Sequence, residues 1–153
     1  MGAPVSPRDI HFTSTDGLAL YGRDYPAAGS ETPLLCLTGL TRNVRDFEPL
    51  ARWLGGARRL VTMDYRGRGR SAYAPDPSTY RPEVELADAL RLLDALEIER
   101  VNVIGTSRGG IIAMIMAAQY PQRLKGVLLN DVGPVIERVS LHRIRSYLGK
   151  ALE

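Results

Sequence analysis

One serine stands between two glycines in the stretch Gly105-Thr106-Ser107-Arg108-Gly109, where a β-branched run gives way to an apolar helical pattern. A G-x-S-x-G spacing between a strand and a helix is typical of a sharp turn that lifts a serine oxygen into the open. The following helix would direct its N-terminal amides toward the same place, which favours a developing oxyanion. Ser107 is therefore a candidate nucleophile, with the backbone N–H of Arg108 as an oxyanion donor. The alternative is that Ser107 only caps a helix.

Two further segments follow predicted strands and belong with this turn. The first, LTGLTRN over residues 37–43, has Gly39 at its tip, so the N–H of Leu40 can supply a second oxyanion donor. The second, DYRGRGRS over residues 64–71, places two glycines in a loop beside it. With the serine turn, these motifs resemble the oxyanion loop, the D-x-R-G-x-G-x-S stretch and the nucleophile elbow of the α/β-hydrolase superfamily.

The resemblance implies a serine hydrolase without a metal or an organic cofactor. In it Ser107 is the nucleophile, and Leu40 and Arg108 contribute the N–H groups of the oxyanion hole. The reaction would be acyl transfer to water from an ester, thioester, amide or lactone, with a small-molecule acyl substrate. A serine at this position argues against the branches that use a carboxylate nucleophile. The usual His-Gly of the oxyanion loop is Thr38-Gly39 here. This change preserves the backbone donor, so it bears on the subfamily and the substrate rather than on the oxyanion hole.

A serine nucleophile needs a general base and a group that orients it, in the chain order Ser, acid, His for this family. The chain has two histidines. His11 falls in the first predicted strand, and His142 falls in a predicted helix, so neither is expected to act as the base. Asp131 ends the last predicted strand and is the candidate acid. We therefore expect the catalytic histidine to be absent from this chain.

The elements that must position these residues follow from apolar periodicity. Two extended runs around Asp16-Gly17 predict an N-terminal hairpin with a tight turn. Continuous apolar runs predict buried parallel strands, and 3.6-residue spacing predicts helices between them. The strands are expected within residues 33–39, 58–67, 100–107 and 124–133, and the helices within 44–56, 81–99, 107–120 and 138–152. The helix over 107–120 is apolar almost all round, so we expect it to be buried.

This order predicts an α/β fold: an N-terminal β-hairpin, then βα units that form a mostly parallel open sheet flanked by helices. Compared with the eight strands of the α/β-hydrolase family, six are present, and each missing βαβ unit needs about 30 residues or more. The chain is thus expected to be a truncated α/β-hydrolase core. Residues 1–135 would form its N-terminal part and residues 136–153 the start of a cap or lid.

Composition limits the other classes of function. The 153 residues contain 18 arginines and two lysines against 17 acidic residues, for a net charge of +3, and the arginines are spread along the chain. This distribution weakens a nucleic-acid or membrane-surface interpretation, and the single RGRGR copy at residues 66–70 lacks an aromatic stacking platform. Cys36 is the only cysteine and is expected to be a small buried hydrophobe. With no signal peptide recognised, a cytoplasmic location is expected.

The last predicted strand has a consequence for partners. The family strand order places residues 126–131 at the edge of the sheet, with apolar residues on both faces, and such an edge favours pairing with another strand. We expect a homodimer, or association with the missing C-terminal half, rather than a plain monomer. The alternative to a catalytic role is a non-catalytic binding or structural half-domain with the same fold.

Overall fold

The computed structural model describes residues 6–133, 135, 137 and 139, and within them it contains six strands and three α-helices. The strands are β1 (Arg8–Thr13), β2 (Ala19–Tyr25), β3 (Leu34–Leu37), β4 (Leu60–Asp64), β5 (Val101–Thr106) and β6 (Leu124–Asn130). The helices are α1 (Glu48–Leu54), α2 (Pro82–Ala95) and α3 (Arg108–Gln119), with short 3₁₀ turns η1 (Val44–Phe47), η2 (Pro77–Thr79) and η3 (Pro121–Arg123). The helix predicted over 138–152 lies outside the described residues.

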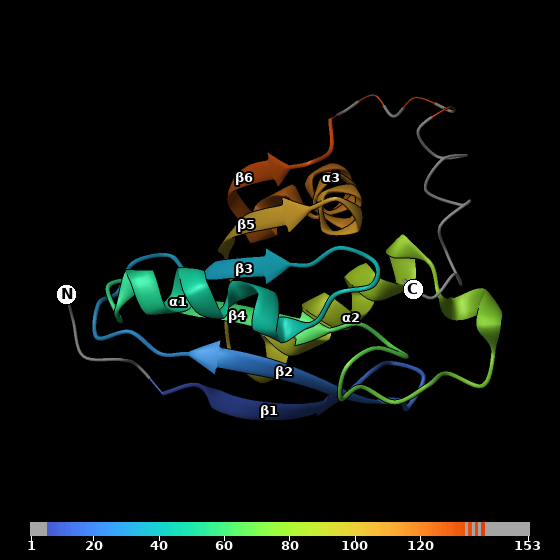
Figure 1. Cartoon of the computed structure of the whole chain (residues 1–153), viewed down its shortest axis with the longest axis horizontal. Helices are drawn as coiled ribbons and strands as arrows, with labels where there is room; N and C mark the ends of the chain where they lie inside the picture. Colours follow the sequence, from blue (N-terminus) through green and yellow to red (C-terminus); the bar gives the residue numbers. More distant parts are fainter. Residues whose placement is uncertain (1–5, 134, 136, 138, 140–153) are drawn as a thin grey trace, which may run out of the picture.

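All six strands form one sheet in the order β1-β2-β4-β3-β5-β6 (Figure 1). The hairpin strands β1 and β2 are antiparallel, and β2 runs antiparallel to β4, whereas β4, β3, β5 and β6 run parallel to one another. The predicted open, mostly parallel sheet with an N-terminal hairpin is confirmed. The parallel strands end on the same edge of the sheet, so the loops after β3, β4 and β5 lie close together.

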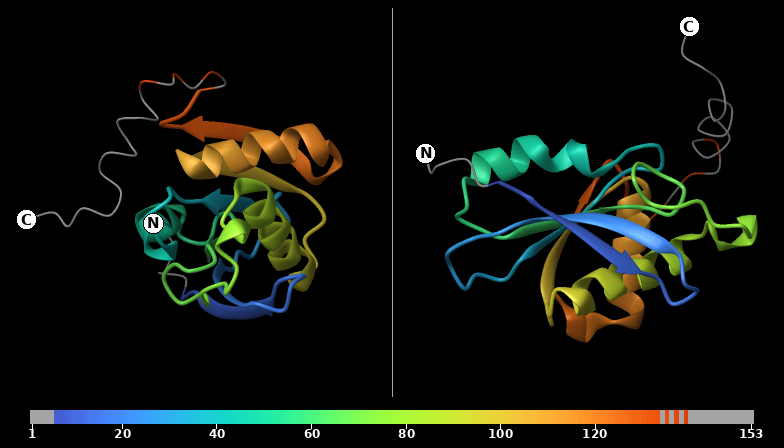
Figure 2. Two further views of the ribbon diagram at one scale, coloured as in Figure 1. Left: turned by 90° about the vertical axis from the view of Figure 1, so that its right-hand side faces the viewer. Right: turned by 90° about the horizontal axis from the view of Figure 1, so that it is seen from below.

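Helices cover both faces of the sheet: α1 lies on one face, and α2 and α3 lie on the other (Figures 1 and 2). The alternation of side chains along β3 shows why its run is apolar throughout. Leu34 and Cys36 pack in the cluster that includes Phe47 and Ala51 beside α1, whereas Leu35 and Leu37 pack in the larger cluster with residues of α2 and α3. Burial raises the pKa of the Cys36 thiol to about 12, which keeps it protonated and unreactive.

The hairpin forms as predicted, but its turn is longer than expected. The last strand pair is Thr13 with Ala19, so five residues connect the strands instead of two. Gly17 has a positive φ of 83°, and the Ser14 hydroxyl accepts a hydrogen bond from the Leu18 N–H at 2.8 Å. The serine side chain therefore closes a wider loop, whose length the Asp16-Gly17 dipeptide alone does not indicate.

Two predicted helices also differ in detail. The segment 44–56 begins as the 3₁₀ turn η1 and becomes the helix α1 only from Glu48, with Pro49 in its first turn and Gly55 in the left-handed conformation after it. The helix α3 is buried along one face rather than all round. It packs on β3, β5, β6 and α2, and residues 117–119 at its C-terminal end are exposed.

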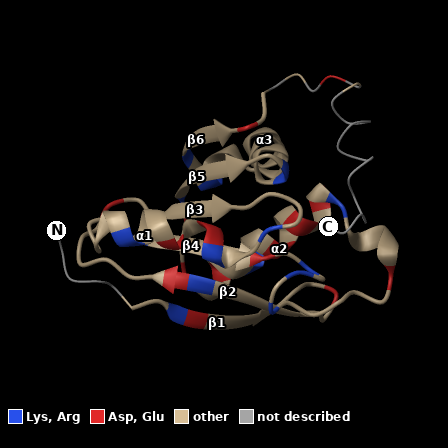
Figure 3. Cartoon of the chain, in the orientation of Figure 1, with Lys and Arg blue, Asp and Glu red and all other residues tan. Residues whose placement is uncertain are grey.

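The strand β6 lies at one edge of the sheet and pairs only with β5 among the described strands, as predicted. Its apolar residues Val127 and Leu128 are 40% and 55% exposed. Figure 3 shows acidic and basic residues mixed along the strands and helices instead of gathered on one element. None of the helices in the described part of the chain is long and apolar enough to cross a membrane.

Candidate active site

The backbone at Ser107 has the geometry of a strained turn. Ser107 lies between β5 and α3 with φ 52° and ψ −111°, and its side chain makes no capping hydrogen bond to the helix. Residues other than glycine occupy such a conformation only where the surrounding structure enforces it, at a cost of about 1–3 kcal/mol. Because the hydroxyl does not cap α3, the geometry favours the presentation of Ser107 over the alternative of a simple helix cap.

The glycines around Ser107 lie where no side chain fits. A Cβ on Gly105 would lie 2.5 Å from the carbonyl oxygen of Gly109, and a Cβ on Gly109 would overlap the carbonyl oxygen of Leu37. A Cβ on Gly110 would overlap the side chain of Val132. These close approaches hold the start of α3 directly against the ends of β3 and β5, which is why the turn is sharp.

Backbone hydrogen bonds fix the turn from three sides. The N–H of Ser107 donates to the carbonyl of Asn130 at the end of β6 at 2.9 Å, and the carbonyl of Ser107 accepts from Gly110 at 2.9 Å. The N–H of Gly109 donates to the carbonyl of Thr38 at 3.1 Å. The buried hydroxyl of Tyr65 donates to that same carbonyl at 2.9 Å, and burial raises the pKa of this phenol. The strands β3, β4 and β6 thus all hold the serine turn.

The predicted oxyanion loop lies beside the serine. A Cβ built on Gly39 would lie 3.9 Å from the Cβ of Ser107, and the Arg42 N–H donates back to the Gly39 carbonyl at 3.2 Å. Within residues 6–133, the N–H groups of Leu40 and Arg108 have no hydrogen-bond partner. Two backbone donors without a partner among these residues, next to a half-buried serine, fit what an oxyanion hole requires.

The segment 64–71 makes hydrogen bonds to the predicted oxyanion loop and to the residues that follow it. The buried carboxylate of Asp64 accepts hydrogen bonds from the N–H groups of Val44 and Arg70, both at 2.8 Å. Gly69 packs so closely on this carboxylate that any Cβ would overlap it. Ser71 donates to the Asp64 carbonyl at 2.7 Å. The side chain of Asp64 therefore connects the loop after β4 to the segment that begins η1.

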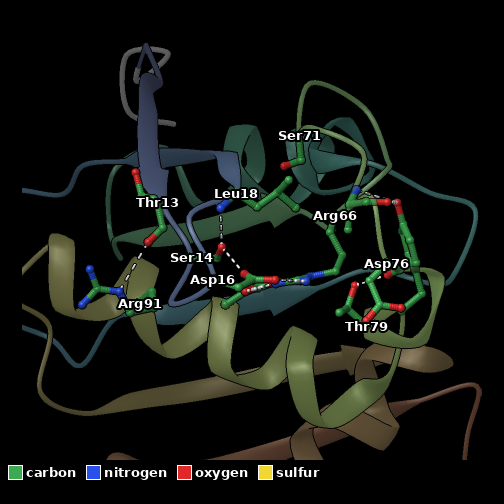
Figure 4. A network of polar contacts seen from close by, with 12 residues as sticks. Thr13, Ser14, Asp16, Leu18, Arg66, Ser71, Asp76, Thr79 and Arg91 are labelled. Atoms are coloured by element: carbon green, nitrogen blue, oxygen red, sulfur yellow. Dashed lines mark hydrogen bonds and ion pairs between the residues drawn. The ribbon is translucent and has the colours of Figure 1, made fainter.

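The guanidinium of Arg66 is completely buried and carries two carboxylate partners. It contacts Asp88 of α2 through Nε and Nη2, both at 2.8 Å. It also contacts Asp16 of the hairpin loop at 3.0 and 3.1 Å (Figure 4). Hydrogen bonds from Arg66, then from Ser14, lower the pKa of Asp16 to about 2. This ion-pair network connects the hairpin loop, the loop after β4 and α2.

A second buried ion pair connects α2 to α3. Nε of Arg108 lies 2.6 Å from the carboxylate of Glu85, and Nη2 donates to the carbonyl of Tyr80 at 3.3 Å. Burial raises the pKa of Glu85, and the hydrogen bond from Arg108 opposes this shift. Sequence reasoning missed this pair. The signal that could have indicated it is the position of Glu85 and Asp88, three residues apart on the face that also carries Leu92.

The two histidines and the candidate acid lie as follows. His11 lies on β1 with its ring 5.6 Å from that of Tyr21, and β1 is four strand spacings, about 19 Å, from β5. His142 lies outside the described residues. Asp131 directly follows β6 with a positive φ of 56° and is exposed. It is adjacent in sequence to Asn130, whose carbonyl accepts from the Ser107 N–H, and among the described residues no hydrogen bond joins its carboxylate to Ser107.

A cavity of about 250 Å³ opens beside Leu40 and Arg108, whose N–H groups are the predicted oxyanion donors. Six residues line it: Leu40, Arg66, Arg68, Tyr80, Glu85 and Arg108. No cluster of three or more His, Cys, Asp or Glu side chains suited to a metal ion occurs in the described residues. The arrangement offers a half-buried serine, two backbone N–H donors and a cavity lined by several charged residues at the carboxyl ends of parallel strands.

Such a sheet, with a serine turn between β5 and α3, defines the α/β-hydrolase architecture. Residues 32–148 match the alpha/beta hydrolase fold family, and the chain belongs to this family.

Relatives support the assignment. The chain is 40% identical over 116 residues to the 3-hydroxybutyrate-oligomer hydrolase of Cupriavidus necator, covering 76% of this chain and 40% of that protein. It is 32% identical over 123 residues to a 2-hydroxymuconate semialdehyde hydrolase of a Pseudomonas species, covering 71% of this chain and 42% of that protein. The crystal structure of an alpha/beta hydrolase from Novosphingobium aromaticivorans is similar with a TM-score of 0.89 and 47% identity, covering 98% of this chain and 52% of that one. The chain therefore spans about half the length of these proteins or less.

Proposed function

We propose that this chain is the N-terminal part of a serine hydrolase that acts on carboxylic esters or related acyl substrates. The observation that carries the proposal is the strained backbone of Ser107, whose hydroxyl makes no capping bond and lies beside the two backbone donors. The names of the relatives from Cupriavidus necator and Pseudomonas support hydrolysis as the class of reaction.

In the proposed reaction the Ser107 hydroxyl oxygen attacks the carbonyl carbon of the substrate, and its proton passes to a histidine base. The carbonyl oxygen takes the negative charge and accepts hydrogen bonds from the N–H groups of Leu40 and Arg108. The alcohol leaves with the proton from histidine, and water then releases the acid from the acyl-enzyme by the same path in reverse. Asp131 is the proposed acid that orients the histidine.

The histidine of this scheme comes from outside the chain. His11 is too far from Ser107 to serve, because β1 lies four strand positions from β5. In this proposal residues 1–135 contribute the nucleophile and the oxyanion donors, and residues 136–153 begin the cap. The remainder of the fold is proposed to pair with the exposed edge over residues 126–131 of β6. A second copy of this chain is the alternative partner for that edge in the absence of the C-terminal half. No role in nucleic-acid or membrane binding is proposed.

Labelling with a fluorophosphonate tests the proposal, because the reagent reacts only with an activated serine. The whole natural protein should gain one adduct, located by peptide mass spectrometry at Ser107. The Ser107→Ala variant should gain none, and Ser78→Ala, which removes an exposed serine from η2, should be labelled like the parent. The 153-residue chain alone should be labelled far more slowly.

Absence of the adduct in the whole protein would instead favour the non-catalytic half-domain. Rapid ester hydrolysis by the purified 153-residue chain would contradict the missing histidine.

A further inference from the structure

The cavity beside the oxyanion donors holds three guanidinium groups, and their partners differ. Arg66 is neutralised by Asp16 and Asp88, all within 3.1 Å. Arg108 is neutralised by Glu85 at 2.6 Å. Two of the three cations that line the cavity are therefore committed to ion pairs inside the fold.

Arg68 is different, because carbonyl oxygens are its only hydrogen-bond partners among the described residues. Its Nε donates to the carbonyl of Leu40 and its Nη1 to the carbonyl of Gly67, each at 3.0 Å. Among the described residues no carboxylate lies within ion-pair distance of Arg68, and its Nη2 makes no hydrogen bond. The side chain is half-buried and lines the cavity. An uncompensated positive charge thus faces the space in which a substrate would lie.

The backbone contacts hold this charge in a fixed place relative to the oxyanion site. The carbonyl that accepts from Arg68 and the N–H that serves as oxyanion donor both belong to Leu40, on consecutive peptide groups. Consecutive Cα atoms are about 3.8 Å apart. A group bound by the remaining guanidinium N–H groups would therefore lie only a few bonds from the carbonyl carbon that Ser107 attacks.

We propose that Arg68 binds a carboxylate on the acyl part of the substrate, so that the enzyme prefers short acyl groups with a terminal carboxylate. Such groups carry the carboxylate about two to four carbon atoms from the reacting carbonyl, a separation comparable with the roughly 3.8 Å between consecutive Cα atoms. A guanidinium is suited to a carboxylate because its planar N–H groups match the two oxygens, and charge-assisted hydrogen bonds are stronger than neutral ones. The inference rests on the proposed function for the identity of the reacting carbonyl.

Binding to a variant without the nucleophile tests this inference independently of turnover. Monomethyl succinate carries a carboxylate, and dimethyl succinate is its neutral counterpart. Isothermal titration calorimetry of the whole natural protein with Ser107→Ala should show binding of the monomethyl ester about tenfold tighter than that of the diester. Adding Arg68→Met should abolish the preference. Arg70→Met is the matched control, since Arg70 lies in the same loop outside the cavity and pairs with Asp9 at 2.9 Å.

The outcomes separate the two proposals. Equal binding of both esters, no binding of either, or a preference that survives Arg68→Met overturns the carboxylate site. If circular dichroism shows that Arg68→Met is unfolded, Arg68→Lys decides: it keeps the charge but loses the planar fork, so the preference should fall at least about threefold. A carboxylate preference without fluorophosphonate labelling would retain the binding site and reject the hydrolase.

Discussion

Ser107 shows how much of the proposed chemistry depends on one backbone conformation. A serine at φ 52° and ψ −111° is unfavourable in isolation, and it is held there by the hydrogen bond to Asn130 and by the glycine contacts. In this conformation the hydroxyl makes no capping hydrogen bond to α3, and the Arg108 N–H has no partner within residues 6–133. The strain at this position thus lowers stability where the proposed nucleophile lies.

Replacing Ser107 by glycine should stabilise the chain by about 1 kcal/mol. Relief of strain contributes about 1–3 kcal/mol, and the greater freedom of glycine in the unfolded chain removes up to about 1 kcal/mol of this. Urea unfolding measures the difference. Ser107→Ala is the control, because it removes the hydroxyl and keeps the strain, and it should stay within about 0.5 kcal/mol of the parent. Equal stability of the two variants would show that the backbone at Ser107 is relaxed.

Gly109 is a position where the space, rather than φ, requires glycine. Gly109→Ala should destabilise the chain by about 3 kcal/mol, because its Cβ would overlap the backbone carbonyl of Leu37, which cannot move aside as a side chain can. Gly29→Ala is the matched control, with nothing within 4 Å of the added carbon, and should be close to neutral. Thermal unfolding of both variants by circular dichroism checks this, and a stable Gly109→Ala would contradict the close packing of α3 on β3.

The helix α2 connects to the loop after β4 and to α3 through charged groups that the sequence does not reveal as pairs. Periodicity predicts where this helix begins and ends, since the apolar spacing from Leu86 to Leu93 is local information. It does not predict that Glu85 binds Arg108 or that Asp88 binds Arg66, because those partners lie about 20 residues away in the chain. Local pattern fixes the elements, whereas long-range contacts fix which charges are neutralised.

The same distinction applies to the site. The order of three motifs was enough to predict that Leu40 and Arg108 border the serine, because parallel strands end at one edge of the sheet. The length of the hairpin loop was mispredicted, since it depends on the Ser14 hydroxyl and not on Asp16-Gly17 alone. Asp64 and Tyr65 belong to the motif over residues 64–71, but the sequence does not show that their side chains bind the loop after β3 and the start of η1.

The contact between the hairpin loop and Arg66 should make folding sensitive to acid. The pKa of Asp16 is about 2, below its ordinary value of 3.8, because Arg66 and Ser14 donate to the carboxylate. A lowered pKa means that the stabilisation is complete above about pH 4 and is lost as the pH falls toward 2. Urea unfolding between pH 5 and 2 should therefore show a smaller loss of stability for Asp16→Asn than for the parent. The exposed Glu83→Gln is the control for removing one carboxylate, and an unchanged slope in Asp16→Asn would contradict the ion pair.

The two edge strands of the sheet differ in character. At one edge lies β1, a polar strand that runs antiparallel to its neighbour, and at the other edge β6 leaves apolar side chains exposed. Edge strands in stable monomers are short, charged or covered, and β6 has seven residues with one lysine. The chain covers 52% of the similar structure from Novosphingobium aromaticivorans, and under the proposed function the remainder of the fold would pair with this edge.

Association of the 153-residue chain should therefore proceed through β6. Sedimentation velocity is expected to show species larger than a monomer, and Leu128→Lys should shift the distribution toward the monomer because a charge at the edge opposes strand pairing. Trp53→Lys is the control: it places the same charge on another exposed apolar residue, on α1, and should leave the distribution unchanged. A parent chain that is monomeric at every concentration would contradict this prediction.

The hydrogen bond from the Ser107 N–H to the Asn130 carbonyl allows the opening of this edge strand to be measured. The amide proton of Ser107 can exchange with deuterium only when the end of β6 moves away from it, since the Asn130 carbonyl is its partner. Its exchange rate therefore measures the local opening of the edge strand at the residue that is proposed as the nucleophile. Anything that anchors β6 should slow this exchange.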